Sequence, residues 1–133
     1  MPKATVHLDL LETVVAVCRL DADDDLPEWG DLTDRHLVSV TRTANELSII
    51  LGQDAVPPGV IAERGWRVLA VRGPLAFSLT GVLAGLAQPL ADASVPIFAL
   101  STYDTDLLLV GQGDLDAATA ALRDAGHTVH APT

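Results

Sequence analysis

The chain has 133 residues, of which 49% are hydrophobic, enough for one compact domain or two very small ones. Eighteen Asp and Glu against eight Lys and Arg give a formal net charge of −10, which excludes nucleic acid and anionic membrane surfaces as expected partners. Cys18 is the single cysteine, so no internal disulfide is possible. No apolar run approaches the ~18 residues of a membrane span, and no secretory signal opens the chain. We therefore expect a cytoplasmic protein.

The chain begins with a weakly alternating segment, residues 5–11, followed by a Val-rich stretch that predicts a strand from Glu12 to Leu20. Residues 21–25 form an acidic loop, and residues 26–29 favour one short helical turn. The loop lacks the Gly and Glu that an EF-hand requires at its sixth and twelfth positions, so we interpret it as a solvated loop and not as a calcium site.

Residues 37–43 and 47–51 read as two further strands joined by a polar turn at Thr43–Glu46. Pro57-Pro58-Gly59 should break the chain before a possible helical turn at residues 60–64. The N-terminal half therefore looks like a strand, a reduced helix and a hairpin.

The C-terminal half opens with a strand at residues 66–72, which Gly73-Pro74 should end. Apolar residues at offsets of three, four and seven then predict a helix from about residue 79 to 90, with Ser78 or Thr80 as its N-cap. Pro89 lacks a backbone N–H and should end or bend this helix.

Two apolar strands, residues 95–100 and 106–110, lie too close together for a crossover and should pair as an antiparallel hairpin. A second helix, at residues 115–125, is expected between Asp114 as its N-cap and Gly126 as its C-terminal stop, and residues 127–130 can add a last short strand. The order strand, helix, strand, strand, helix, strand is a βαββαβ, ferredoxin-like unit.

Polar side chains gather in the turn of that hairpin, at Ser101, Thr102, Asp104, Thr105 and Asp106. In such a fold the loop at residues 73–80, which runs into the first helix, lies nearby. A helix N-terminus suits a carboxylate and an aspartate suits an ammonium, so a zwitterionic amino acid would match both. The other interpretation is a capped turn in which Asp and Thr bond their own backbone, and on spacing alone it is preferred.

The sequence offers no catalytic machinery. None of the four histidines has a partner at zinc-site spacing, and no nucleotide-binding loop or nucleophile elbow is present. Asp104 and Asp106 would share a strand face but have no partner base. We therefore expect no metal, no cofactor, no catalytic residue and no enzymatic activity.

The decapeptide Ser101–Val110 resembles the signature of the ACT domains in the cytosolic arginine sensor of the mTORC1 pathway and in its bacterial ACT-domain relatives. Weaker similarity extends to the loop and helix start at residues 73–82, to residues 41–50 and to residues 7–11. The resemblance implies an α+β fold of two tandem ferredoxin-like, ACT-type units, residues 1–65 with reduced helices and residues 66–133.

The resemblance also implies an amino-acid-binding, regulatory protein that forms a homodimer. The residues then expected to bind the ligand are Gly73, Phe77, Gly81, Val82, Ser101, Thr102, Asp104 and Asp106.

One departure concerns the segment before Gly81. Where the arginine sensor has an acidic residue, this chain has Ser78-Leu79-Thr80, so a smaller or apolar amino acid fits the resemblance at least as well as arginine. The alternative function is a ligand-free interaction or dimerisation subunit that docks on an enzyme.

Overall fold

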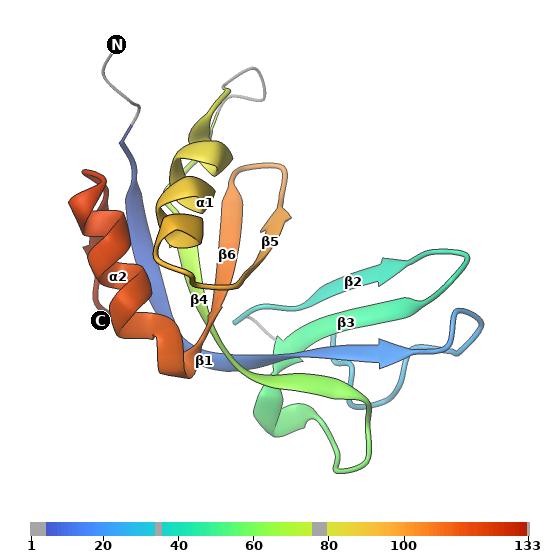
Figure 1. Ribbon diagram of the computed structural model, residues 1–133. Coiled ribbons are helices and arrows are strands. Elements are labelled where there is room, and N and C mark those ends of the chain that lie inside the picture. The colour runs from blue at the N-terminus through green and yellow to red at the C-terminus, as the bar shows by residue number, and fades with distance from the viewer. Residues whose placement is uncertain (1–4, 34–35, 76–79, 133) are drawn as a thin grey trace. The chain divides into compact units, whose positions relative to one another are not determined.

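The computed structural model describes residues 5–33, 36–75 and 80–132 (Figure 1). The chain divides into two compact units, one of residues 1–12 with 67–133 and one of residues 13–66, which we call the C-terminal and N-terminal units. The division falls within strand β1 (His7–Leu20) and within strand β4 (Ala62–Val71), so each strand contributes to both units. The expected boundary at 65/66 lies next to the division in β4, but residues 1–12 group with the second half.

The C-terminal unit contains a sheet of strands β5 (Ile97–Ser101), β6 (Asp106–Gly111) and β7 (Thr128–His130) with parts of β1 and β4, in the order β7-β1-β4-β6-β5. The expected β5–β6 hairpin is present and antiparallel, and β7 is present but pairs in parallel with β1. The sequence predicted a unit built from residues 66–133 alone. Instead β1 inserts between β4 and β7, where the Arg72 N–H donates to the His7 carbonyl at 2.9 Å.

Two helices, α1 (Val82–Asp92) and α2 (Leu115–Asp124), cover one face of this sheet (Figure 1). Residues at helical spacing on α1 and α2 share a core with alternate strand residues, as the apolar pattern predicted. The buried members of this core are Leu8, Leu69, Val71, Val82, Leu86, Leu90, Val95, Leu108, Val110, Ala118, Leu122 and Val129. Asp114 precedes α2 as expected, and Gly126, with φ 98°, follows its end.

Helix α1 differs from the expectation at both ends. Its N-cap is Gly81, with φ 83°, rather than Thr80, and Ser78 lies outside the described residues. Pro89 does not end the helix. It also leaves no carbonyl unpaired, because the Gly85 carbonyl, which the N–H of any other residue at position 89 would have bonded, lies 3.0 Å from His127 Nε2.

The N-terminal unit consists of β2 (Ser39–Arg42), β3 (Leu47–Gly52) and the remaining parts of β1 and β4, in the order β2-β3-β1-β4. Strands β2 and β3 pair antiparallel, as expected for the 37–51 hairpin. Strand β1 also pairs antiparallel with β3. Its core comprises Ala16, Cys18, Leu47, Ile49, Leu51 and Val56. Burial raises the pKa of the Cys18 thiol.

Residues 13–33 and 36–66 contain no α-helix, only a short 3₁₀ turn at Gln53–Ala55. The predicted helical turn at 26–29 is a single turn closed by the Gly30 N–H on the Pro27 carbonyl, 2.9 Å apart. The helical turn predicted at 60–64 is wrong, because residues 62–64 belong to strand β4 and the Arg19 N–H donates to the Ile61 carbonyl at 2.9 Å just before it. Among the described helices, none is long and apolar enough to cross a membrane.

Candidate functional site

The polar turn between β5 and β6 is closed by its own hydrogen bonds. Ser101 and Asp106 face each other in the strand register, and Ser101 Oγ donates to Asp106 Oδ1 at 2.5 Å. The Thr102 N–H donates to the Thr105 carbonyl at 2.7 Å, and the Thr105 N–H donates to Thr102 Oγ1 at 3.2 Å. The geometry is that of the capped turn which spacing alone favoured.

The same turn packs against the segment that follows β4. Thr105 Oγ1 donates to the Val71 carbonyl at 2.6 Å, and the Leu75 N–H donates to the Asp104 carbonyl at 2.6 Å. A Cβ atom on Gly73 would lie 2.8 Å from the Asp104 oxygen, closer than a side chain tolerates. The structure thus brings Gly73 together with the 101–106 turn, through contacts of Thr105 and Leu75 that the sequence pattern did not single out.

Asp104 differs from Asp106 in what its carboxylate touches. Within the described part of the chain, the exposed Asp104 side chain makes no hydrogen bond or ion pair, whereas half-buried Asp106 accepts the Ser101 hydroxyl. Asp104 therefore offers a solvated carboxylate, and Asp106 offers one that the turn already orients.

The start of α1 supplies the other predicted residues. Gly81 is exposed, and its carbonyl accepts the first helical hydrogen bond, from the Gly85 N–H at 2.8 Å. The Val82 side chain is 7% exposed and belongs to the core, so only its backbone is available to a ligand. Among the described residues, no side chain caps this first turn and no acidic residue lies in it, and a helix start offers backbone N–H groups that suit a carboxylate. Phe77 lies outside the described residues.

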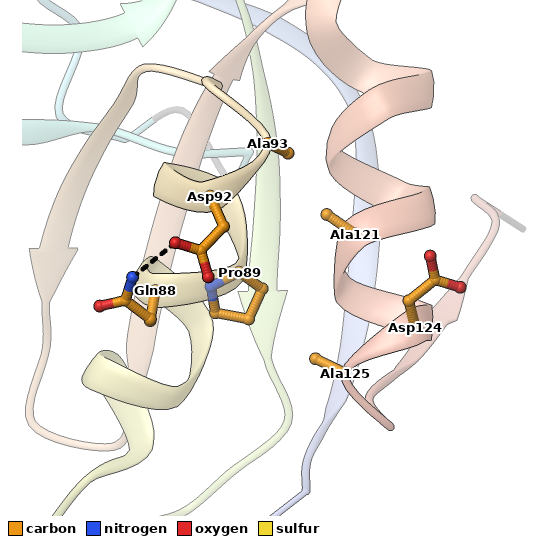
Figure 2. Close-up of a pocket in the computed structure, with 7 residues that line it drawn as sticks. All are labelled: Gln88, Pro89, Asp92, Ala93, Ala121, Asp124 and Ala125. Atoms are coloured by element: carbon orange, nitrogen blue, oxygen red, sulfur yellow. Dashed lines mark hydrogen bonds between the residues drawn. The ribbon is translucent and has the colours of Figure 1, made fainter.

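A separate cleft of about 430 Å³ lies between α1 and α2 (Figure 2). Small side chains line it between two aspartates, Asp92 on α1 and Asp124 on α2, and Gln88 Nε2 donates to Asp92 Oδ1 at 2.8 Å. None of the ligand-binding residues expected from the sequence lines this cleft. Its complete lining is Gln88, Pro89, Asp92, Ala93, Ala121, Asp124 and Ala125.

No group of three or more His, Cys, Asp or Glu residues that could hold a metal ion occurs among residues 5–33, 36–75 and 80–132.

In comparisons with known proteins, two family models match parts of this chain. A model described as an ACT domain matches residues 61–124, and a second model, described as an N-terminal domain, matches residues 14–59. The Bos taurus cytosolic arginine sensor for mTORC1 subunit 1 is 30% identical over 95 residues, which are 63% of this chain and 29% of that protein. The chain spans less than two thirds of the length of the curated relatives it matches.

Solved structures show the same fold. Protein Atu0741 from Agrobacterium tumefaciens superimposes with a TM-score of 0.90 at 35% identity, covering 98% of this chain and 96% of that one. The regulatory subunit of aspartate kinase from Thermus flavus has a TM-score of 0.63 at 17% identity, covering 92% of this chain and 99% of that one. The bovine relative is named as a sensor and not as a catalyst, in line with the expectation of a chain without enzymatic activity.

Proposed function

The chain belongs to the ACT-domain proteins, and from this we propose that it is a regulatory module that binds an amino acid. A regulatory, ligand-binding role in general is what the family and the name of the bovine relative support. The nature of the ligand is our own inference from the residues around the 101–106 turn.

The observation that carries the proposal is the packing of the 101–106 turn on the segment that leads to α1. Two contacts tie them together, Leu75 N–H to the Asp104 carbonyl and Thr105 Oγ1 to the Val71 carbonyl, each 2.6 Å long. The backbone N–H groups at the start of α1 suit the ligand carboxylate, and the carboxylates of Asp104 and Asp106 suit its ammonium group.

The ligand need not be arginine. Ser78-Leu79-Thr80 carries no acidic residue to hold a guanidinium group. An amino acid with a smaller or apolar side chain requires no such carboxylate and fits at least as well as arginine.

The proposal extends to the assembly. We infer two tandem ACT-type units in a cytoplasmic homodimer, the first with reduced helices, whose boundary in the second half of the chain lies near residue 65 and which both use β1. The bovine relative is more than three times as long as the region it shares with this chain, and a homodimer would supply a second pair of units.

A ligand-free interaction or dimerisation subunit that docks on an enzyme is the second candidate function. Two observations favour it: Ser101 and Thr102 of the turn already bond to Asp106 and Thr105 of the same turn, and the edge strand β5 exposes 36% of Phe98. Co-purification with one enzyme, together with no response to any amino acid, would select this function.

Thermal unfolding in the presence of each of the twenty amino acids tests the first proposal. A ligand at about a hundred times its dissociation constant should stabilise the folded chain by about 2.7 kcal/mol. Asp106→Asn keeps an oxygen that can accept from Ser101 but removes the charge, and it should abolish the response. Asp54→Asn, an exposed aspartate of the N-terminal unit, is the matched control and should respond like the wild type. If no amino acid raises the midpoint, the amino-acid proposal is wrong.

A further inference from the structure

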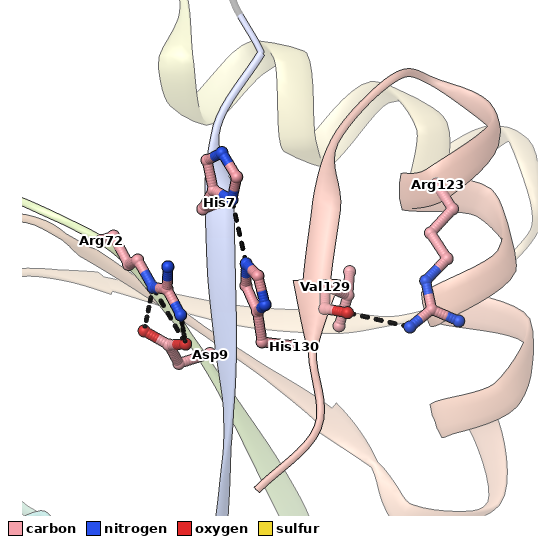
Figure 3. A network of polar contacts seen from close by, with 6 residues as sticks. All are labelled: His7, Asp9, Arg72, Arg123, Val129 and His130. Atoms are coloured by element: carbon pink, nitrogen blue, oxygen red, sulfur yellow. Dashed lines mark hydrogen bonds and ion pairs between the residues drawn. The ribbon is translucent and has the colours of Figure 1, made fainter. Parts of the chain in front are cut away.

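Two histidines from opposite ends of the chain meet on neighbouring strands of the C-terminal unit (Figure 3). His7 lies on β1 and His130 on β7, and His7 Nδ1 is 2.9 Å from His130 Nε2. The ring planes are inclined by 15° and the ring centroids are 5.2 Å apart, so the nitrogens, and not the ring faces, are the closest parts. The pair is a hydrogen bond between two imidazoles at an exposed position.

Such a hydrogen bond exists only while one of the two facing nitrogens lacks a proton. A neutral imidazole has one donor and one acceptor nitrogen, whereas a protonated imidazole has two donors and no acceptor. When both rings are protonated, two N–H groups and two positive charges face each other. Histidine is the side chain that ordinarily changes charge between pH 5 and 8.

The surrounding charges stabilise the histidine pair with one extra proton better than the pair with two. Asp9 is opposite His130 in the strand register, and Arg72 from β4 binds its carboxylate with contacts of 2.9 to 3.1 Å. The Arg72 hydrogen bonds hold the pKa of Asp9 below its usual range, with smaller contributions from His130 and His7, so Asp9 stays anionic at mildly acidic pH. Arg72 already neutralises that carboxylate, and Arg123 from α2, a further cation beside β7, donates to the Val129 carbonyl.

Strand β7 is three residues long and lies at the edge of the sheet, and its paired positions in the described sheet are His7–Asp9 of β1. Its Val129 side chain is buried in the core, and the Val129 carbonyl accepts from Arg123. A three-residue edge strand nevertheless opens locally at a smaller free energy than the whole unit, so a modest change in its pairing energy alters how often it opens.

We propose that His7 and His130 form a pH-sensitive latch, whose hydrogen bond strengthens the pairing of β7 with β1 at neutral pH and is lost when both rings are protonated. On this proposal the paired strands bind one proton fewer than the open form at acidic pH. The stability of the β7–β1 pairing therefore falls as the pH falls, by about tenfold per pH unit for each excluded proton. This inference is independent of the amino-acid site.

Amide hydrogen exchange of residues 128–130 in the full chain tests the latch. We expect protection factors, which are corrected for intrinsic exchange, to fall about tenfold or more between pH 7.5 and pH 5.0 in the wild type. In His130→Gln the fall should be less than about twofold, since the amide can hydrogen-bond to His7 but takes up no proton. His36→Gln removes an exposed histidine of the N-terminal unit and should behave like the wild type.

The outcome is decided even if His130→Gln does not fold, because His7→Gln removes the other half of the pair. Nitrogen-15 NMR of the wild-type histidines also counts the protons directly, and one shared N–H between the rings at pH 7.5 is expected. Protection that does not change with pH, or that falls equally in wild type and both variants, overturns the latch. Two histidines that take up protons independently of each other overturn it as well.

Discussion

The two compact units of the chain use the same two strands and differ in what covers them. In the C-terminal unit α1 and α2 contribute Val82, Leu86 and Leu90, with Ala118 and Leu122, to a core of twelve buried residues. In the N-terminal unit the core has six buried residues, and residues 13–33 and 36–66 contain no α-helix. The difference shows that apolar residues at helical spacing, present in only one half, decide how large a core each part of β1 and β4 can support.

The largest effect should come from matched truncations of the two cores. Leu86→Ala, at a fully buried position on α1, should lower the free energy of unfolding toward the upper end of about 2–5 kcal/mol. Leu51→Ala, on β3 of the N-terminal unit, should lie toward the lower end, because fewer buried neighbours lose contacts. Denaturant unfolding measures both. Leu83→Ala, at a position on α1 that is 38% exposed, is the control and should change stability little. Equal losses in the free energy of unfolding for Leu86→Ala and Leu51→Ala would show that the helices do not make the C-terminal core more sensitive to truncation.

A smaller effect is expected at His127, which joins α1 to the sheet in the C-terminal unit alone. Its Nδ1 accepts the Val6 N–H at 3.2 Å, so its Nε2 carries the proton and donates to the Gly85 carbonyl. His127→Ala leaves both part-buried backbone groups without this partner and should lower the free energy of unfolding by about 1–3 kcal/mol, measured by denaturant unfolding.

Pro89→Ala sharpens that test, since alanine restores the N–H that the Gly85 carbonyl lacks within the helix. In the double variant the loss of His127 should cost about 1 kcal/mol less than in the wild-type background. An additive double-mutant cycle would contradict the explanation given for the uninterrupted helix.

The smallest effect concerns pH and the Asp9–Arg72 pair. The pKa of Asp9 is lowered by its hydrogen bonds to Arg72, so its contribution is present above the unfolded value and is lost as the pH falls through the folded one. Both side chains are about half exposed, and Asp9→Asn should therefore cost a few tenths to about 1 kcal/mol at pH 7 and almost nothing near pH 2. Stability measured between pH 2 and 7 checks the sign, and a constant difference across that range would contradict it.

Much of the fold was predictable because it depends on local chemistry. The 3.6-residue apolar spacing predicted α1 and α2, Gly126 predicted the end of α2, and the two apolar runs around Ser101–Thr105 predicted the β5–β6 hairpin. The site was predictable only in part. The polar turn, Thr105 included, could be found from the clustering of its residues, but Leu75 carries no signal in sequence, and nothing there announces that Thr105 bonds the Val71 carbonyl.

By itself, the sequence determined an α+β chain with two helices in its second half, an acidic surface and a polar turn beside an apolar hairpin, since these features follow from spacing and composition over a few residues. Only the tertiary structure decided that β1 lies between β4 and β7, that residues 62–64 belong to strand β4, and that His127 takes the carbonyl left by Pro89. These outcomes join residues far apart in the chain, and backbone groups carry no side-chain pattern that announces their partners.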